Sequence, residues 1–176
     1  MKKVMLLTIF AALMMISSAA VAQTASGTLT VTATVNGSIN LVFNSDAAGV
    51  ALSSGAGTNA ATLAFGNVSA FGAISAGIVR STTATTFTVS SAVDVLVTKT
   101  NSASANYKLT AQLGSADAVN TWTVGGIAVT NAAQSTLTAT GTYAANSNFP
   151  VAITVPFTTA SGTLISNTIN YIATAN

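Results

Sequence analysis

The sequence offers few side chains that carry out chemistry. It contains no histidine, no cysteine and no glutamate, and these types supply the commonest general bases, thiol nucleophiles and transition-metal ligands. Lys99 and Lys108 lie in threonine-rich segments without a nucleophile motif, which argues against a serine–lysine pair. Nothing around Asp46, Asp94 or Asp117 resembles a calcium loop. We therefore expect no catalytic, cofactor-binding or metal-binding residues, and no enzyme activity.

The charged residues argue against nucleic acid or anionic membranes as partners. The chain has a formal net charge of +2 and a pI near 9.2, but Lys2 and Lys3 belong to its first three residues. Further along, Arg80, Lys99 and Lys108 balance the three aspartates. Phosphate binding needs clustered lysine and arginine, and three scattered cations cannot form such a patch.

The first residues resemble a secretory signal. Lys2 and Lys3 precede an apolar run from Val4 to Ile16, and small residues follow up to Ala22. This order predicts a signal peptide over residues 1–22 with cleavage before residue 23. The apolar run is shorter than the about 20 residues that a membrane span needs. We therefore expect residues 23–176 to form a single exported domain without a membrane span, found in the periplasm in transit and then at the cell surface or outside the cell.

The spacing of apolar residues after residue 22 indicates β-strands. Odd-numbered positions are apolar and even-numbered ones are mostly Thr, Ser or Asn, which is the period of a strand with one buried face. Threonine and valine, both β-branched, dominate these stretches. The alternating stretches comprise residues 29–35, 37–43, 87–97, 107–113, 137–143 and 151–157.

Turn residues separate the strands. Gly125-Gly126 predicts a two-residue hairpin that places Trp122 opposite Val129 on one face. Residues 63–68 read as a short core strand in which Gly66 allows a bend. Residues 45–61 read as a loop, and residues 70–84 as partly strand.

Asn36-Gly37 is also a two-residue turn signal, but its flanking residues do not fit a hairpin. A hairpin at this point would put the apolar residues of its two arms on opposite faces, whereas a chain that runs on keeps them in phase. We therefore expect the strand at residues 27–35 to lie beyond a glycine hinge, where it can join its own sheet or be donated to a neighbour. Pattern alone leaves an ordinary first strand equally open.

Eight to ten short strands without helical spacing predict an all-β, immunoglobulin-like antiparallel β-sandwich, with a barrel as the alternative. Four aromatic residues could stack on sugar rings, but each lies in or beside an alternating stretch, so core positions are favoured. They are Tyr107, Trp122, Tyr143 and Tyr171.

Three stretches, residues 27–35, 63–68 and 160–171, resemble spore coat protein U domains, which include the pilin subunits of archaic chaperone-usher fibres. The family's cysteines have no counterpart here, around Ile39 or in residues 95–98. The resemblance implies an incomplete sandwich whose groove is filled by the next subunit's N-terminal strand. It also implies a periplasmic chaperone and an outer-membrane usher as partners. The donor side chains would be Leu29, Val31, Ala33 and Val35, and the groove-bordering C-terminal strand would carry Ile165, Ile169 and Tyr171.

The composition also favours assembly. Only 5% of the residues are charged, against about 25% in ordinary globular proteins, so few charges are available to guard exposed strand edges. We expect a structural subunit of a pilus, fimbria or coat that forms a homopolymer by strand exchange. The alternative is a monomeric secreted module for adhesion or carbohydrate binding.

Overall fold

The computed structural model describes residues 26–176, so the predicted signal peptide at residues 1–22 lies outside the described residues. The chain divides into two units at Val35, and each is treated by itself. In the first unit, residues 26–34 belong to no helix or strand and are exposed.

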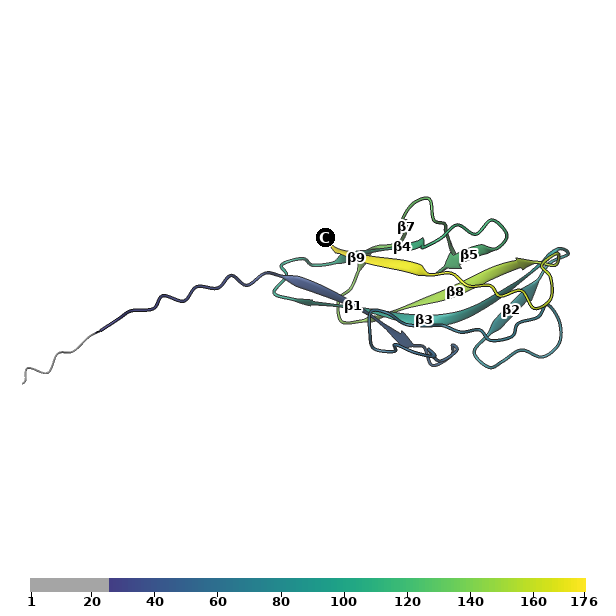
Figure 1. Cartoon of the computed structure of the whole chain (residues 1–176), viewed down its shortest axis with the longest axis horizontal. Coiled ribbons are helices and arrows are strands. Elements are labelled where there is room, and N and C mark those ends of the chain that lie inside the picture. Colours follow the sequence, from purple (N-terminus) through teal and green to yellow (C-terminus); the bar gives the residue numbers. More distant parts are fainter. Residues whose placement is uncertain (1–25) are drawn as a thin grey trace, which may run out of the picture. The chain divides into compact units, whose positions relative to one another are not determined.

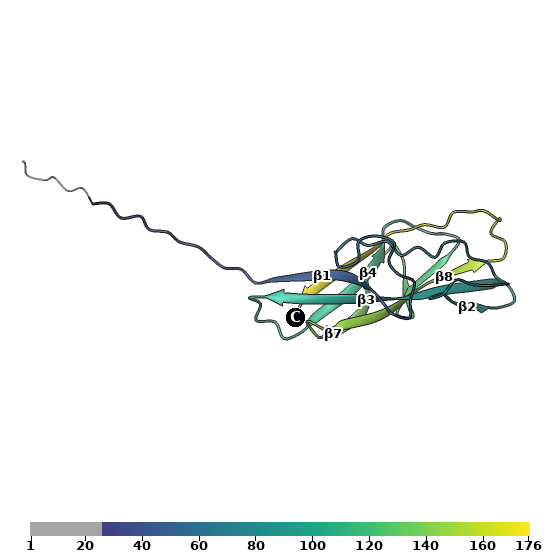
Figure 2. The same ribbon diagram turned by 90° about the horizontal axis from the view of Figure 1, so that it is seen from below.

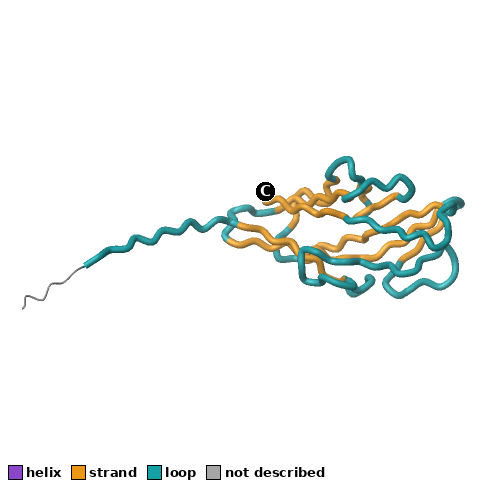
Figure 3. The backbone as a smooth tube through the Cα atoms, viewed as in Figure 1, coloured by secondary structure: helices purple, strands orange, loops and turns teal. Residues whose placement is uncertain are grey.

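The second unit is built from antiparallel strands, and no helix occurs within residues 26–176. Figure 1 and Figure 3 show strands that run along the unit and are joined by loops. The strands are β1 (Ser38–Ser45), β2 (Val79–Thr82), β3 (Thr86–Thr100), β4 (Tyr107–Leu113), β5 (Thr121–Val124), β6 (Ile127–Val129), β7 (Ser135–Gly141), β8 (Asn146–Pro156) and β9 (Ile169–Ala175).

These strands form two sheets. The larger sheet has the order β1-β3-β8-β5-β6, and β2 pairs with β3 beyond the end of β1. The smaller sheet has the order β7-β4-β9. Figure 2, turned by 90° from Figure 1, shows β1 running alongside β3. The predicted β-sandwich is confirmed, and because the strands separate into two sheets the barrel alternative is wrong.

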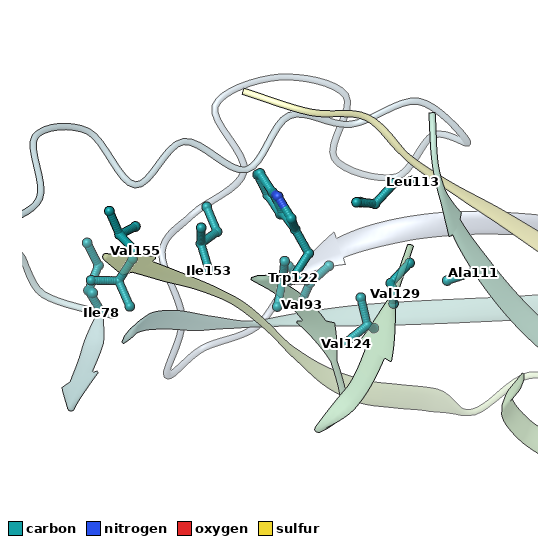
Figure 4. Packing of buried hydrophobic residues seen from close by; sticks show 11 residues of the cluster. Ile78, Val93, Ala111, Leu113, Trp122, Val124, Val129, Ile153 and Val155 are labelled. Carbon is teal, nitrogen blue, oxygen red and sulfur yellow. The ribbon is translucent and has the colours of Figure 1, made fainter. Parts of the chain in front are cut away.

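The alternating residues of the sequence face the space between the sheets. On β3 the odd-numbered residues from Val89 to Val97 are buried and the even-numbered ones are half-buried, and β4 and β8 alternate in the same way. A strand has a side-chain period of two, so one face of each strand supplies the core. Figure 4 shows part of this core, to which both sheets contribute.

The hairpin at Gly125-Gly126 has the predicted register. Trp122 pairs with Val129, and Val124 pairs with Ile127. Both glycines have positive φ, as a two-residue turn requires. Trp122 is buried with 6% of its surface exposed and lies within the core cluster (Figure 4). Its indole is therefore not available for stacking on a sugar.

The predicted short strand at residues 63–68 is wrong. These residues belong to no strand, although Leu63, Phe65 and Val68 pack partly buried against the core as expected. Gly66 has φ +66°, which bends the chain and prevents a ladder from continuing. The long connection between β1 and β2 thus contributes core side chains from irregular backbone.

Candidate functional site

β9 and β1 are the edge strands on one side of the sandwich. β9 pairs only with β4 and β1 only with β3 among the strands of residues 26–176. The two edges face each other, since the rings of Phe43 and Tyr171 meet edge to face with centroids 5.1 Å apart. The edge of β1 is partly occupied, because Phe43 N donates to Thr58 O at 2.9 Å and Gly57 N donates to Phe43 O at 2.7 Å. The outer edge of β9, which we call the acceptor edge, is the open one.

Hydrogen bonds at both ends of β9 show which of its peptide groups are free. Gly114 N donates to Thr168 O at 2.7 Å, and Asn176 N donates to Asn106 O at 2.9 Å. In an antiparallel pair the residues that bond to the partner alternate along the strand, so the even-numbered residues of β9 point their peptide groups toward β4. The odd-numbered residues Ile169, Tyr171 and Ala173 therefore point theirs toward the open side.

The side chains of these odd-numbered residues point inward but are not fully covered. Ile169, Tyr171 and Ala173 are half-buried, as are Leu41 and Phe43 on β1. By contrast, the inward-facing residues in the middle of the sandwich are almost completely buried, with Val95, Val97 and Leu109 at 0% exposure. The core is thus less well covered along the side where β1 and β9 face each other.

The predicted groove-bordering residues lie close to this edge. Ile169 and Tyr171 are on β9, whereas Ile165 precedes the strand and is half-buried against the core. Ala173 lies on the same face and was not among the predicted residues, because the resembling stretch ends at Tyr171. Burial raises the pKa of the Tyr171 phenol well above its ordinary value of 10, as desolvation of an anion requires.

The predicted donor residues are apolar and exposed. Leu29 is 88% exposed, Val31 81% and Val35 74%, and Ala33 is also exposed. They alternate with threonines, so an extended backbone would place all four on one face. This segment belongs to no strand within the described chain. It therefore presents a row of unpaired backbone groups and an uncovered apolar stripe.

Several charged side chains of the described chain make structural contacts. Asn148 Nδ2 donates to Asp46 Oδ2 at 2.8 Å and to Asp94 Oδ1 at 3.0 Å. Lys99 Nζ donates to a backbone carbonyl and lies 5.0 Å from the centroid of the Tyr143 ring. No group of three His, Cys, Asp or Glu side chains that could hold a metal ion occurs within residues 26–176.

No family model, no curated protein and no solved structure matches this chain. Across residues 26–176, no helix has the length and apolar character needed to cross a membrane.

Proposed function

We propose that the chain is an exported structural subunit of a surface fibre or coat, in which residues 27–35 of one copy add as a strand to the acceptor edge of the next. The observation that carries the proposal is that two parts of the same chain, residues 27–35 and the acceptor edge, match each other. An exposed apolar stripe alternates at period two, and the acceptor edge has free peptide groups and half-covered inward side chains at the same period. Added strands gain main-chain hydrogen bonds and specificity from alternate side chains.

Strand addition would also complete the core. An added strand whose apolar residues point inward places Leu29, Val31, Ala33 and Val35 beside Ile169, Tyr171 and Ala173. Each Å² of apolar surface removed from water contributes about 25 cal/mol. The contact of one copy's N-terminal segment with another copy's β9 is head to tail, and such a contact generates filaments when its rotation does not close a ring.

The family resemblance gives further support. The two neighbourhoods where the family's cysteines have no counterpart lie on adjacent strands, since Ile39 pairs with Lys99 and Leu41 with Val97. The two neighbourhoods in which that family usually has a cysteine and its partner are thus side by side here. The same resemblance suggests a periplasmic chaperone that covers the acceptor edge before assembly and an outer-membrane usher that exports the subunits.

The proposal is tested by placing a charge on either face of the donor segment. Val31→Asp would bring an unpaired carboxylate into an apolar contact at a cost of about 3 kcal/mol or more, which weakens strand addition roughly 100-fold. Thr32→Asp carries the same charge on the opposite face and is the matched control. Size-exclusion chromatography and negative-stain microscopy should show filaments for the wild type and for Thr32→Asp, and monomers for Val31→Asp.

Removing the donor gives a second test. A chain without residues 23–35 should not polymerise, and a synthetic peptide of residues 27–35 should bind and stabilise it. The proposal fails if this shortened chain is unfolded with and without peptide. It also fails if the full chain stays a monomer in which residues 28–35 are protected from hydrogen exchange by their own chain. A self-contained binding module would then be the better account.

A further inference from the structure

Asn36 and Gly37 follow the donor segment directly and precede β1, and they belong to no strand. Both residues are exposed, and the pairing of β1 with β3 begins only at the next residue, Ser38. Within residues 26–176, neither the Asn36 amide nor the Gly37 backbone N–H makes a hydrogen bond. The proposed strand addition gives the Asn36 side chain no role.

An asparagine that glycine follows can react with its own backbone. Asparagine is among the thermolabile residues, because the backbone nitrogen of the next residue can attack the side-chain Cγ and close a five-membered succinimide ring. The new C–N bond forms as the bond from Cγ to Nδ2 breaks, and the amide leaves as ammonia with the proton of the attacking nitrogen. Water then opens the ring at either carbonyl and gives aspartate or isoaspartate. Both reacting groups belong to one chain, so water is the only other reactant.

Asn36 is the only asparagine of the sequence that glycine follows. Glycine has no Cβ to shield its nitrogen and the greatest freedom of backbone rotation, so the ring closes most easily there. The fold also favours glycine at this position, because a Cβ on Gly37 would lie 2.7 Å from the backbone oxygen of Asn101 and 3.1 Å from Cα of Ser102. A larger residue that would slow the reaction therefore does not fit unless the backbone shifts.

Two other asparagines show what hinders the reaction. Asn40 is exposed, but it lies in β1 opposite Thr98 and precedes Leu41. Asn167 is held through both ends of its amide, since Oδ1 accepts from Ser115 Oγ at 3.2 Å and Nδ2 donates to Ser115 O at 3.0 Å. Ring closure needs rotation of the backbone and of the side chain, which a ladder or a bonded amide opposes. Exposure alone therefore does not single out Asn36, whereas its free amide and its glycine neighbour do.

We propose that Asn36 is a site of spontaneous deamidation, by which the chain modifies its own link between the donor segment and β1. The product carries one negative charge at neutral pH, since an aspartate has a pKa of about 3.9. The isoaspartate form also passes the main chain through Cβ, which adds one atom to the backbone between Val35 and Gly37. The reaction does not depend on strand addition. If residues 27–35 are donated, residues 36 and 37 become the link between successive subunits, and these links would change as a fibre ages.

The test is incubation of the folded, full mature chain at mildly alkaline pH and body temperature. Mass spectrometry of proteolytic fragments, with electron-transfer fragmentation to distinguish isoaspartate from aspartate, should find the change at Asn36 before any other asparagine. Isoelectric focusing should show a more acidic form, because the sequence holds only three Asp and Glu residues and gains one more carboxylate. Asn36→Gln keeps an exposed amide before Gly37, but its longer side chain closes a ring far more slowly, so the acidic form should disappear. Asn40 is the internal control and should stay intact.

Two results would overturn the proposal. One is a folded chain in which Asn36 stays intact while the same chain unfolded in urea is converted, because the fold would then hold the dipeptide in an unreactive geometry. The other is an acidic form that Asn36→Gln still gives at the wild-type rate, which would place the reaction elsewhere. The Val31→Asp chain keeps the two proposals apart, because Asn36 should be converted in it whether or not the wild type forms filaments.

Discussion

Replacing Trp122 with alanine removes the largest side chain of the core cluster around β5. The indole is 6% exposed, it lies opposite both Val129 and Ile153, and its Nε1 donates to Asp117 Oδ2 at 2.8 Å. Large-to-small changes of a buried tryptophan cost about 3 to 5 kcal/mol. With a urea slope of about 2 kcal/mol per M, the midpoint of unfolding should fall by roughly 2 M.

The assay must be circular dichroism, because Trp122 is the only tryptophan of the chain and its fluorescence is lost with it. Trp122→Phe keeps most of the apolar volume and removes the hydrogen bond to Asp117, so its expected cost is smaller, about 1.5 kcal/mol. A free energy of unfolding for Trp122→Ala that stays within about 0.5 kcal/mol of the wild type would place the side chain outside the core and refute the reasoning.

Asp117, which accepts the hydrogen bond from Trp122, should make the stability of the fold depend on pH. Burial alone would raise the pKa of Asp117, but hydrogen bonds from Asn120, Trp122 and Val119 outweigh it and lower the pKa from 3.8 to about 2. Because the pKa of Asp117 is lower in the folded state than in the unfolded state, the ionised carboxylate stabilises the fold when the pH is above the unfolded-state pKa. This contribution is lost as the pH falls toward the folded-state pKa. The stability difference between wild type and Asp117→Asn should therefore narrow between about pH 4 and pH 2.

Three other changes probe separate parts of the fold. Gly141→Ala should destabilise by about 1 to 3 kcal/mol in urea unfolding, because the new Cβ would lie 2.2 Å from Cζ of the fully buried Tyr107; an unchanged midpoint would mean that the ring moves freely. Ser91→Ala should cost about 1 to 3 kcal/mol, since Ser91 Oγ is the acceptor for Val50 N at 2.7 Å; no loss of stability would show that this amide finds another acceptor. Because the pKa of Tyr171 is raised in the folded state, its contribution to stability is fully present below pH 10, the ordinary pKa of tyrosine, and is lost as the pH rises above that value. Tyr171→Phe should therefore reduce the fall in melting temperature at alkaline pH. An equal fall in both proteins would contradict this cause.

The strands that could be predicted from the sequence are those with one buried face. β4 matches its predicted range, β3 contains its range, and β8 covers its range except for residue 157, because Val89, Leu109 and Ile153 lie on core faces that repeat at period two. The Gly125-Gly126 turn fixed the register of β5 and β6. In these segments local pattern and tertiary packing favour the same structure.

Other parts depended on contacts that no local pattern reveals. β7 ends at Gly141, short of the predicted Tyr143, because Gly141 pairs with Tyr107, the first residue of β4, and β7 has no partner on β4 beyond it. Residues 63–68 pack on the core without joining a ladder. The contact between the β4–β5 loop and the β8–β9 loop was not predicted, because Ser115 and Asn167 lie 52 residues apart in sequence and are joined by side-chain hydrogen bonds.

Strand addition at the acceptor edge is tested most directly by amide hydrogen exchange along β9, residue by residue, in assembled wild type and in monomeric Val31→Asp. Ile169, Tyr171 and Ala173 should exchange slowly only in the assembly, because their N–H groups point to the open side. Asn170 and Ile172, whose N–H groups point toward β4, should be protected in both samples and serve as internal controls. Equal exchange of the three odd-numbered amides in both samples would show that no strand is added to β9.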